Sequence, residues 1–383
     1  MSRACADCLR RAWLLRLLSG HLEAVRGEIV EVLALSDREL LAVVGGRRRR
    51  ELERRLSRAR REPALRAARA AGLEVICRCD AGYPTRLREL HSPPACVYVA
   101  GGLERFLAAV ADEPVAVVGA RRASSYGLDI ARSLGRGLAA AGLTVISGMA
   151  LGVDSAAHEG AIAAAGPAAG TAPAAATGPA AATGPAAATG PAVAVLPGSA
   201  DNPYPPSRRR LYRQLVERGA AISELPPQTP VRRWGFVARN RIVAALSAAT
   251  VVVEAAAGSG ALITAAFARE LGRTVGGVPG RVTTLQAEGT NGLLADGARI
   301  VRGPQDVLDA LYGIGARTAL TDHRPELTDE TREVFGAVVA GSDTAEALAA
   351  AEIAPGRALA ALAWLELSGY VRRQPGGRFA VIP

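Results

Sequence analysis

The sequence predicts an α/β protein in three parts, with a parallel sheet at its centre. Short β-rich segments alternate with amphipathic helical segments from residue 115 to residue 311. Residues 9–62 show helical periodicity alone, and residues 325–383 combine three helical segments with a hairpin pattern. Strands that alternate with helices form βαβ crossovers, which place helices on both faces of a parallel sheet. We therefore expect a Rossmann-like parallel sheet domain between a small N-terminal helical domain and a C-terminal winged-helix domain.

The N-terminal domain is expected over residues 1–75, as a bundle of short helices of the SAM-like kind. Apolar residues recur at helical spacing and glycines separate the runs. The Arg-rich stretch 47–61 has Leu52 and Leu56 four residues apart, so it is expected to be a helix with a basic outer side. The basic side of this helix could equally be a solvated surface or a contact with DNA. Beyond it, the Pro-containing segments after residue 76 indicate a connector.

The central domain is expected over residues 76–312. Its strands are predicted at 115–118, 143–147, 193–196, 220–223, 250–254, 274–278 and 299–301, and its helices at 127–141, 152–165, 207–218, 240–247, 260–271 and 304–311. Residues 166–191 contain only Gly, Pro, Ala and Thr, including PAAATG three times in succession. Nothing there is large enough to form a core, so this stretch is predicted to be a disordered surface insertion without function.

The C-terminal domain is expected over residues 325–383. Helices are predicted at 330–339, 344–350 and 355–368, followed by a hairpin, which is the winged-helix arrangement. This segment holds five Arg and eight acidic residues. A protein-contact or regulatory role therefore fits it at least as well as DNA binding.

The composition excludes several classes of enzyme. The formal net charge is +10, and all 46 basic residues are Arg, because the chain contains no lysine. Walker A loops, Schiff-base and PLP enzymes and protein kinases all need a lysine. A coding bias explains Arg in place of Lys, but not where the charge lies. No apolar run is long enough for a membrane span, and we expect a soluble, cytoplasmic protein.

The positive charge is concentrated in two segments. Residues 1–80 hold 18 Arg and 11 acidic residues, and residues 207–241 hold nine Arg and two acidic residues. The second segment includes RRWGFVARNR, which places Arg233, Phe236, Arg239, Asn240 and Arg241 at a predicted loop-to-helix junction. Arg neutralises phosphate, and aromatic rings stack on unpaired bases. This mixture favours binding of single-stranded nucleic acid, although a core role for Phe236 and an ion pair for Arg239 also fit.

Three glycine-containing turns follow predicted strands and precede helices. The first holds Gly119 and Arg121, the second Ser147 and Gly148, and the third Ser259 and Gly260. Backbone N–H groups at such turns bind anions, and ligands of parallel sheets bind at the carboxyl ends of the strands. The G-x-G-x-x-G spacing of dinucleotide-binding folds is absent, so ordinary turn glycines are the alternative for each loop.

Two other groups are assigned no function from the sequence. Asp154 and His158 lie four residues apart on one predicted helix, where a helix-start carboxylate with a partnered His is a more common explanation than a catalytic dyad. Cys5 and Cys8 have metal-ligand spacing, but no second pair follows nearby, and Cys77, Cys79 and Cys96 do not complete a zinc pattern. We expect ordinary thiols, with neither a metal nor a cofactor.

Taken together, the motifs resemble the DNA-processing protein A family (DprA, also called Smf). The matching segments are VAVVGARRASSYG, VISGMALGVDSAAHEGA, AVLPGSADNPYPP, FVARNRIVAALS, VVVEAAAGSGALITA, and VPG followed by GTNGLLADGA. They cover about residues 80–311 apart from the insertion. This sequence has Ala120 where the family usually has Ser, and Leu151 where Arg is usual, which removes one hydroxyl and one cationic contact.

The resemblance implies a homodimeric protein that binds single-stranded DNA without catalysis and loads the recombinase RecA during natural transformation. By motif, Gly119 and Arg121 correspond to the family's G-S-R turn, and Arg233 and Phe236 to its basic-x-x-Phe pair. Residues 239–241 match its R-N-R. A nucleotide-hydrolysing enzyme of the related phosphoribohydrolase type is the second hypothesis. A scaffold that works through its terminal domains is the third.

Overall fold

The computed structural model describes residues 4–164, 190–318 and 325–382. They form two compact units, Met1–Leu320 and Thr321–Pro383. The N-terminal helices therefore cluster with the sheet in one unit, and the boundary predicted at residues 75 and 76 stays a prediction. The insertion predicted at residues 166–191 lies outside the described residues except for its last two positions.

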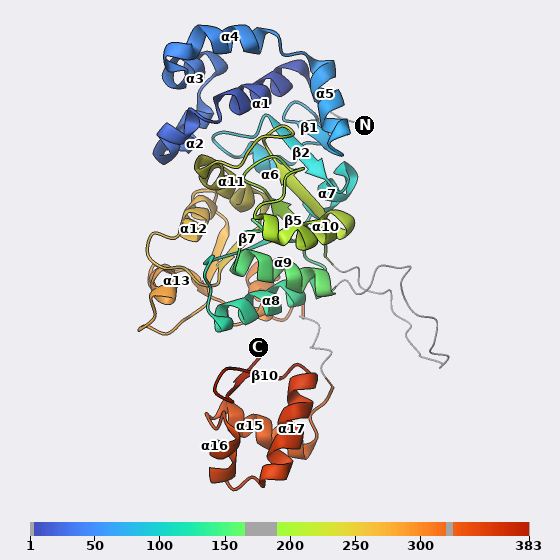
Figure 1. Ribbon diagram of the computed structural model, residues 1–383, viewed down its shortest axis with the longest axis vertical. Helices are drawn as coiled ribbons and strands as arrows, with labels where there is room; N and C mark the ends of the chain where they lie inside the picture. The colour runs from blue at the N-terminus through green and yellow to red at the C-terminus, as the bar shows by residue number, and fades with distance from the viewer. Residues whose placement is uncertain (1–3, 165–189, 319–324, 383) are drawn as a thin grey trace, which may run out of the picture. The chain divides into compact units, whose positions relative to one another are not determined.

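A nine-stranded sheet forms the centre of the first unit, in the order β1-β2-β6-β5-β4-β3-β7-β8-β9 (Figure 1). It is parallel from β6 to β9, as the alternating pattern predicts, while β2 is antiparallel to both β1 and β6. The strands are β1 (Glu74–Cys77), β2 (Cys96–Ala100), β3 (Val115–Val118), β4 (Val145–Ser147), β5 (Ala192–Val195), β6 (Ala220–Ser223), β7 (Ala249–Val252), β8 (Thr274–Gly277) and β9 (Arg299–Ile300). The region expected to be a connector thus supplies the edge strand β1 and its neighbour β2.

Helices cover both faces of the sheet because its central strands are apolar on both sides. In β3, Val115 and Val117 belong to one core, and Ala116 and Val118 belong to the other. The first core includes residues of α8 (Ser125–Ala140), α9 (Val153–Ala164), α10 (Arg209–Arg218) and α14 (Pro304–Tyr312), with η3 (Pro206–Arg208) leading into α10. Helices that contribute to the second core are α6 (Thr85–Arg88), α7 (Leu103–Ala109), α11 (Arg233–Leu246), α12 (Gly260–Glu270) and α13 (Leu285–Ala295).

The order in which strands are added changes side at β3, although the strands stay parallel. From β3 the strands are added in one direction as far as β6, and α11 then carries the chain back to β7 on the other side of β3. The carboxyl ends of β3 and β7 consequently flank a topological switch point. In open α/β sheets this is where ligands bind.

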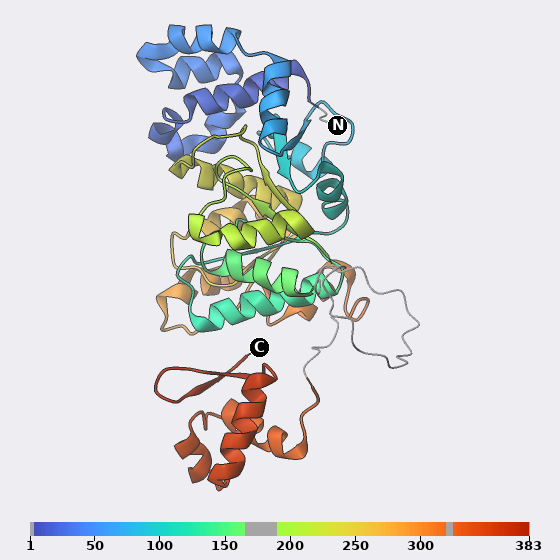
Figure 2. The ribbon, with the colours of Figure 1, turned by 45° about the vertical axis from the view of Figure 1, so that its right-hand side comes forward.

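The N-terminal helices pack against α11 (Figures 1 and 2). They are α1 (Ala6–Leu18), η1 (Leu22–Glu28), α2 (Ile29–Ala34), α3 (Asp37–Val44), η2 (Gly46–Arg48), α4 (Arg49–Ser57) and α5 (Arg61–Ala70). The fully buried Trp234 joins their core, and its indole N–H donates to the carbonyl oxygen of Ser19 at 2.9 Å. This contact fixes the first turn of α11, which is expected from the sequence to be a loop.

Glu23 caps α11 from a distant part of the chain. Its Oε2 accepts hydrogen bonds from the backbone N–H groups of Arg233 at 2.9 Å and Trp234 at 3.3 Å. The preceding residue, Arg232, provides no side-chain cap. A carboxylate at a helix N-terminus satisfies free N–H groups and interacts favourably with the helix dipole.

Replacing Glu23 by alanine should lower the free energy of unfolding by about 1 kcal/mol, because the cap of α11 is lost. Urea denaturation followed by circular dichroism measures this. Glu31→Ala is the matched control, since Glu31 is exposed on α2. Equal stability of the two variants would show that the cap contributes nothing.

The second unit consists of three helices and a hairpin, as the sequence predicts. They are α15 (Asp329–Val339), α16 (Ala345–Ala350) and α17 (Pro355–Leu367), with β10 (Val371–Arg373) antiparallel to β11 (Phe379–Val381). The unit has its own core, which includes Val334, Leu348, Leu362 and Phe379. Its assignment as a winged helix stays a prediction. Across all described residues, the helices are too short or too polar to cross a membrane.

Candidate nucleic-acid interface

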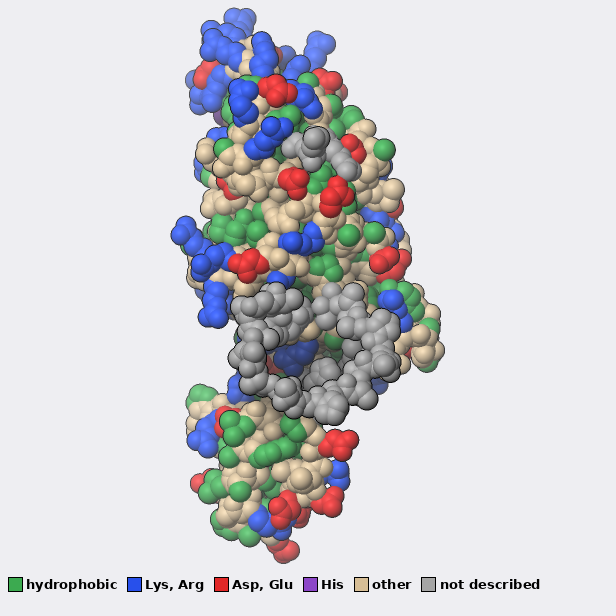
Figure 3. All heavy atoms as spheres, turned by 90° about the vertical axis from the view of Figure 1, so that its right-hand side faces the viewer, with side chains coloured by type: hydrophobic (Ala, Val, Ile, Leu, Met, Phe, Trp, Pro, Cys, Tyr) green, Lys and Arg blue, Asp and Glu red, His purple; other side chains and the backbone are tan. Residues whose placement is uncertain are grey.

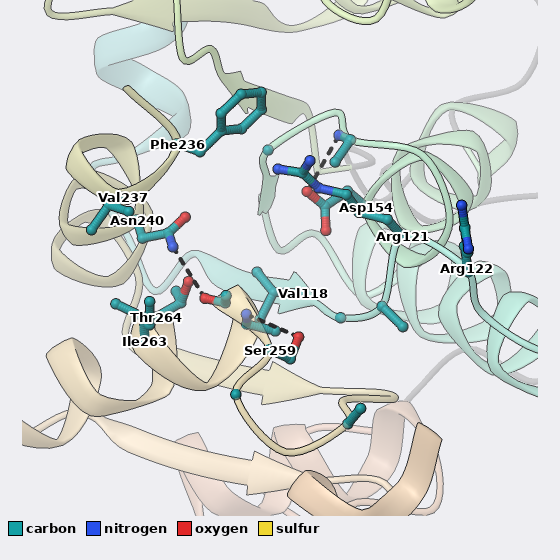
Figure 4. Close-up of a pocket in the computed structure, with 18 of the residues that line it drawn as sticks. Val118, Arg121, Arg122, Asp154, Phe236, Val237, Asn240, Ser259, Ile263 and Thr264 are labelled. Atoms are coloured by element: carbon teal, nitrogen blue, oxygen red, sulfur yellow. Dashed lines mark hydrogen bonds between the residues drawn. The ribbon is translucent and has the colours of Figure 1, made fainter. Parts of the chain in front are cut away.

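A hollow of about 510 Å³ lies at the carboxyl ends of the central strands, at the switch point (Figure 4). Four segments form its walls: the turn after β3, the turn after β4, the first half of α11, and the loop from β7 into α12. Most of the predicted site residues line it, namely Gly119, Arg121, Gly148, Phe236, Arg239, Asn240, Ser259 and Gly260. The folding of the sheet thus brings four separate sequence motifs to one place.

The ring of Phe236 is the centre of a small cationic and aromatic cluster in this hollow. The guanidinium carbon of Arg121 lies 4.4 Å from the ring centroid, and that of Arg239 lies 5.5 Å from it. Tyr204 meets the same ring edge-on, with the centroids 5.5 Å apart. Phe236 is half-buried and Arg121 is exposed. An accessible ring beside an exposed cation is suited to a base and its phosphate.

Arg239 holds two neighbouring strand ends together. Its guanidinium is buried and donates to the carbonyl oxygens of Gly148 and Val195, the latter at 2.7 Å. An Asp154 carboxylate oxygen lies 3.6 Å away. Burial lowers the pKa of Arg239 to about 10, against the opposing effect of Asp154. The group is therefore charged at neutral pH, and its contacts with the protein position the ring and the turn after β4.

Gly148 is required by this packing. A Cβ atom at position 148 would collide with the guanidinium of Arg239. The glycine of the second predicted loop thus makes room for a side chain of the protein. The need for glycine at position 148 is therefore explained by Arg239 without any ligand.

Three predicted contact residues do not line the hollow: Arg233, which is exposed, and Ser147 and Arg241, which are buried. Arg241 is 1% exposed and pairs with Glu224, with 2.6 Å between the nitrogen and the oxygen. Ser147 is fully buried, and its hydroxyl donates to the carbonyl oxygen of Val117 at 2.7 Å. Both side chains are engaged within the protein, and their role as direct DNA contacts stays a prediction. Arg241 misses the hollow because of the helical geometry of α11, in which residues 239 and 241 point in different directions from the helix axis.

Much of the first predicted anion loop is already occupied by the protein itself. Glu254 accepts hydrogen bonds from the N–H of Ser124 at 2.8 Å and from its hydroxyl at 2.5 Å. The Ala120 N–H donates to the carbonyl oxygen of Glu254 at 2.6 Å. These amides are therefore not available to a phosphate, contrary to our expectation. The exposed side chain of Arg121 is the cation that this turn presents to the hollow.

In the second predicted loop, too, a backbone N–H group is bonded to a carboxylate of the protein. The Ala150 N–H donates to the Asp154 carboxylate at 3.3 Å. Burial raises the pKa of Asp154, and Arg239 opposes that effect. His158 is fully buried, and burial lowers its pKa to about 3. Asp154 thus pairs with Arg239. The structure does not favour a catalytic dyad of Asp154 with the fully buried His158.

The third loop leaves the most backbone exposed. Gly258 and Gly260 are exposed, and Ser259 caps α12 by accepting the Ala261 N–H at 3.4 Å. Asn240 reaches across from α11 and donates to the Gly260 carbonyl oxygen at 3.1 Å, as the dashed line in Figure 4 shows. Asn240 therefore orders this loop, and the loop forms the wall opposite Arg121.

Sequence reasoning missed several residues in or beside the hollow. Tyr204 does not line the hollow but contacts Phe236, and it lies inside the segment AVLPGSADNPYPP without a signal of its own. Arg122 lines the hollow, yet Figure 4 shows its side chain directed away from Phe236. Ile263 is partly exposed on α12, and Leu285 and Gln286 come from the start of α13. No local pattern could have assigned them, because the crossovers alone bring α12 and α13 to this edge.

Basic residues outside the hollow form a second surface. Figure 3 shows Arg side chains gathered over the end of the unit formed by the N-terminal helices. On α4, Arg50, Arg54 and Arg55 are exposed, while Arg49 pairs with Glu53 at 2.8 Å. Arg233 is also exposed, at the start of α11, and does not line the hollow. The α4 surface is thus the competing candidate for contact with nucleic acid.

Comparison with known proteins shows the family of the chain. The family model of DNA recombination-mediator protein A matches residues 74–312. The chain belongs to this family. The matched region contains the whole sheet and every residue that lines the hollow. The resemblance to DprA and Smf proteins that the motifs indicate is confirmed.

Individual relatives span different shares of the chain. The putative DNA processing protein DprA of Mycobacterium tuberculosis (strain ATCC 25618 / H37Rv) is 35% identical over 274 residues, which cover 70% of this chain and 64% of that protein. This match therefore spans less than two thirds of the mycobacterial relative. Protein Smf of Synechocystis is 29% identical over 334 residues, with 78% of each chain covered.

Two solved structures share the fold. DNA processing protein A of Streptococcus pneumoniae gives a TM-score of 0.59 at 26% identity, covering 80% of this chain and 96% of that one. The protein of the same name from Helicobacter pylori gives a TM-score of 0.50 at 25% identity, covering 62% and 95%. The latter structure is described as showing a single-stranded DNA binding mode. The α/β fold class is thereby confirmed.

Proposed function

We propose that this protein binds single-stranded DNA at the hollow between β3 and β7, without chemical turnover. The observation that carries the proposal is the half-buried ring of Phe236 between the guanidinium groups of Arg121 and Arg239. A base would stack on the ring, while the exposed Arg121 would swing to the adjoining phosphate. The buried Arg239 would stay in place and hold the ring.

The proposed site favours a single strand over a duplex. A ring inside a hollow is accessible to an unpaired base, whereas bases of a duplex are stacked on one another. The third loop, with exposed backbone at Gly258 and Gly260, would accept the sugar-phosphate chain on the opposite side. Such contacts carry little sequence information, so binding would be nearly indifferent to base sequence.

We further propose the roles that the family implies. The chain would act as a homodimer, load the RecA recombinase onto the bound strand and take part in natural transformation. The description of the matching family as a recombination mediator supports this role. A mediator needs affinity for the strand and for its partner, and it needs no reaction at the strand.

A nucleotide-hydrolysing enzyme, the second hypothesis, has less support. Among the described residues that line the hollow, the carboxylate is Asp154, which is buried and paired with Arg239. Glu254 accepts two hydrogen bonds from Ser124. A carboxylate engaged in this way is a poor general base. Release of free base from nucleoside monophosphates would revive the hypothesis.

Fluorescence anisotropy with a labelled dT oligonucleotide tests the proposed binding. We expect tighter binding of the single strand than of a duplex of equal length, and similar affinity for a mixed-sequence strand. The affinity should fall with salt, with a log–log slope of about −2 if three phosphates are neutralised. Equal affinity for the duplex, or no dependence on salt, would contradict the proposal.

A further inference from the structure

Four cysteines from two distant parts of the chain meet beside the first strand. Cys5 and Cys8 lie at the start of α1, Cys77 ends β1, and Cys79 lies in the turn that follows. Their four sulfur atoms all lie within 4.8 Å of one another. A second pair of cysteines therefore lies beside Cys5 and Cys8. It is about 70 residues away along the chain, too far for a local spacing pattern to show it, but adjacent in space.

The four sulfur atoms are close enough together to bind one metal ion, and one of their separations matches the edge of a tetrahedron of sulfurs around zinc. A Zn–S bond of about 2.3 Å in tetrahedral geometry places neighbouring sulfurs about 3.8 Å apart. The Cys8 and Cys79 Sγ atoms are 3.6 Å apart. This is far longer than a disulfide bond, which measures about 2.05 Å. An iron–sulfur cluster would hold thiolates that bind different iron atoms farther apart, all four of them in a 4Fe–4S cluster and the two pairs in a 2Fe–2S cluster.

The surroundings of the cluster also suit thiolate ligands. The backbone N–H of Cys5 donates to the Cys77 Sγ at 3.4 Å, and hydrogen bonds of this kind support ligating atoms from outside the metal's own shell. Cys8 and Cys77 are buried, Cys5 is half-buried and Cys79 is exposed. One side of the cluster is thus closed by protein, while the Cys79 side gives an ion a path from solvent.

We propose that Cys5, Cys8, Cys77 and Cys79 bind one Zn²⁺ ion as a structural site. Four thiolates close the coordination sphere and leave no position for a substrate, which is the arrangement of structural rather than catalytic zinc. Zn²⁺ displaces the thiol protons on binding, and no electron is transferred. The site joins the first helix of the chain to the edge strand β1.

The position of the site suggests what it stabilises. The N-terminal helices supply Glu23 and Ser19, which fix the first turn of α11. A metal that ties α1 to β1 would restrain this layer against the sheet. Loss of the metal should therefore loosen the N-terminal helices first, and affect DNA binding only through α11.

Metal analysis of the full chain tests the proposal. The protein should carry its purification tag at the C-terminus and be purified under reducing conditions without chelator. Inductively coupled plasma mass spectrometry should then find one zinc per chain. Cobalt titration of the metal-free protein should give thiolate-to-cobalt charge-transfer bands and the visible spectrum of a tetrahedral site, and zinc should abolish both.

Two variants locate the site. Cys79→Ser changes the exposed ligand and should lose most of the zinc while the chain still folds. Cys96→Ala is the matched control, because Cys96 lies opposite Cys77 in the strand pair β1–β2 but outside the cluster, and it should keep one zinc. A chelator should lower the Tm of the parent protein and of Cys96→Ala by several degrees, and that of Cys79→Ser by less.

Three results would overturn the proposal. The first is reduced parent protein that contains no zinc and gives no charge-transfer bands with cobalt. The second is iron in place of zinc. The third is a disulfide between any two of the four cysteines in freshly purified protein, found by alkylation and mass spectrometry. None of these results bears on DNA binding at the hollow.

Discussion

Replacing Phe236 by alanine should weaken binding of a dT oligonucleotide by about 1–3 kcal/mol, or about five- to 150-fold, because one base loses its stacking partner. The ring is half-buried and its neighbours are Arg121, Arg239 and Tyr204. Adding Arg121→Ala should weaken binding further and reduce the log–log salt slope by about one, because one phosphate contact disappears. Anisotropy titrations at several salt concentrations measure both effects.

The matched control is Arg50→Ala, which removes an equal charge from the exposed side of α4. It should leave the affinity within about twofold of the parent, because α4 lies outside the hollow. If Arg50→Ala weakens binding more than the double variant does, the basic surface of the N-terminal helices is the true contact. Circular dichroism of each variant should show that its fold is unchanged.

Arg241→Met should lower the free energy of unfolding by about 3–5 kcal/mol, because it leaves the Glu224 carboxylate buried without its partner. Arg241 is 1% exposed, and its nitrogen lies 2.6 Å from the Glu224 oxygen. The double variant Arg241→Met with Glu224→Gln should recover much of that loss, since the unpaired charge is gone. Urea denaturation gives the free energies of unfolding of the parent, the single variant and the double variant.

The same variants decide whether Arg241 contacts DNA. We expect the folded double variant to bind a dT oligonucleotide nearly as well as the parent, because Arg241 does not line the hollow. A variant that keeps full stability but loses DNA affinity would show that Arg241 is a direct contact and that the ion pair with Glu224 is incidental.

The sequence predicts the central fold well because its signals are local. Each parallel strand is a short apolar run followed by a turn and an amphipathic helix, and the order of these elements is enough to indicate a parallel sheet. The strand-end turns are marked by Gly119, Gly148 and Gly260. Their meeting at one hollow follows from parallel topology. The edge strand β1 and its neighbour β2 are not among the predicted strands, because the prolines between them indicate a connector.

The remaining features of the site depend on contacts between distant residues. The start of α11 is missed because its cap is Glu23, about 210 residues away. Arg239 and Arg241 look equivalent in the R-N-R string, yet each is buried against a different acidic partner. Likewise, the cysteine cluster forms only because β1 lies beside α1. A pattern along the chain cannot show which way a side chain points or what faces it.

Photochemical cross-linking tests most directly whether DNA binds at the hollow. An oligo-dT strand carrying a single bromodeoxyuridine would be irradiated with the full chain, and the cross-linked peptides identified by mass spectrometry. If DNA binds at the hollow, cross-links should form to Phe236 or Tyr204. The Phe236→Ala variant should lose the cross-link at residue 236. Cross-links confined to α4 or to residues 325–382 would contradict binding at the hollow.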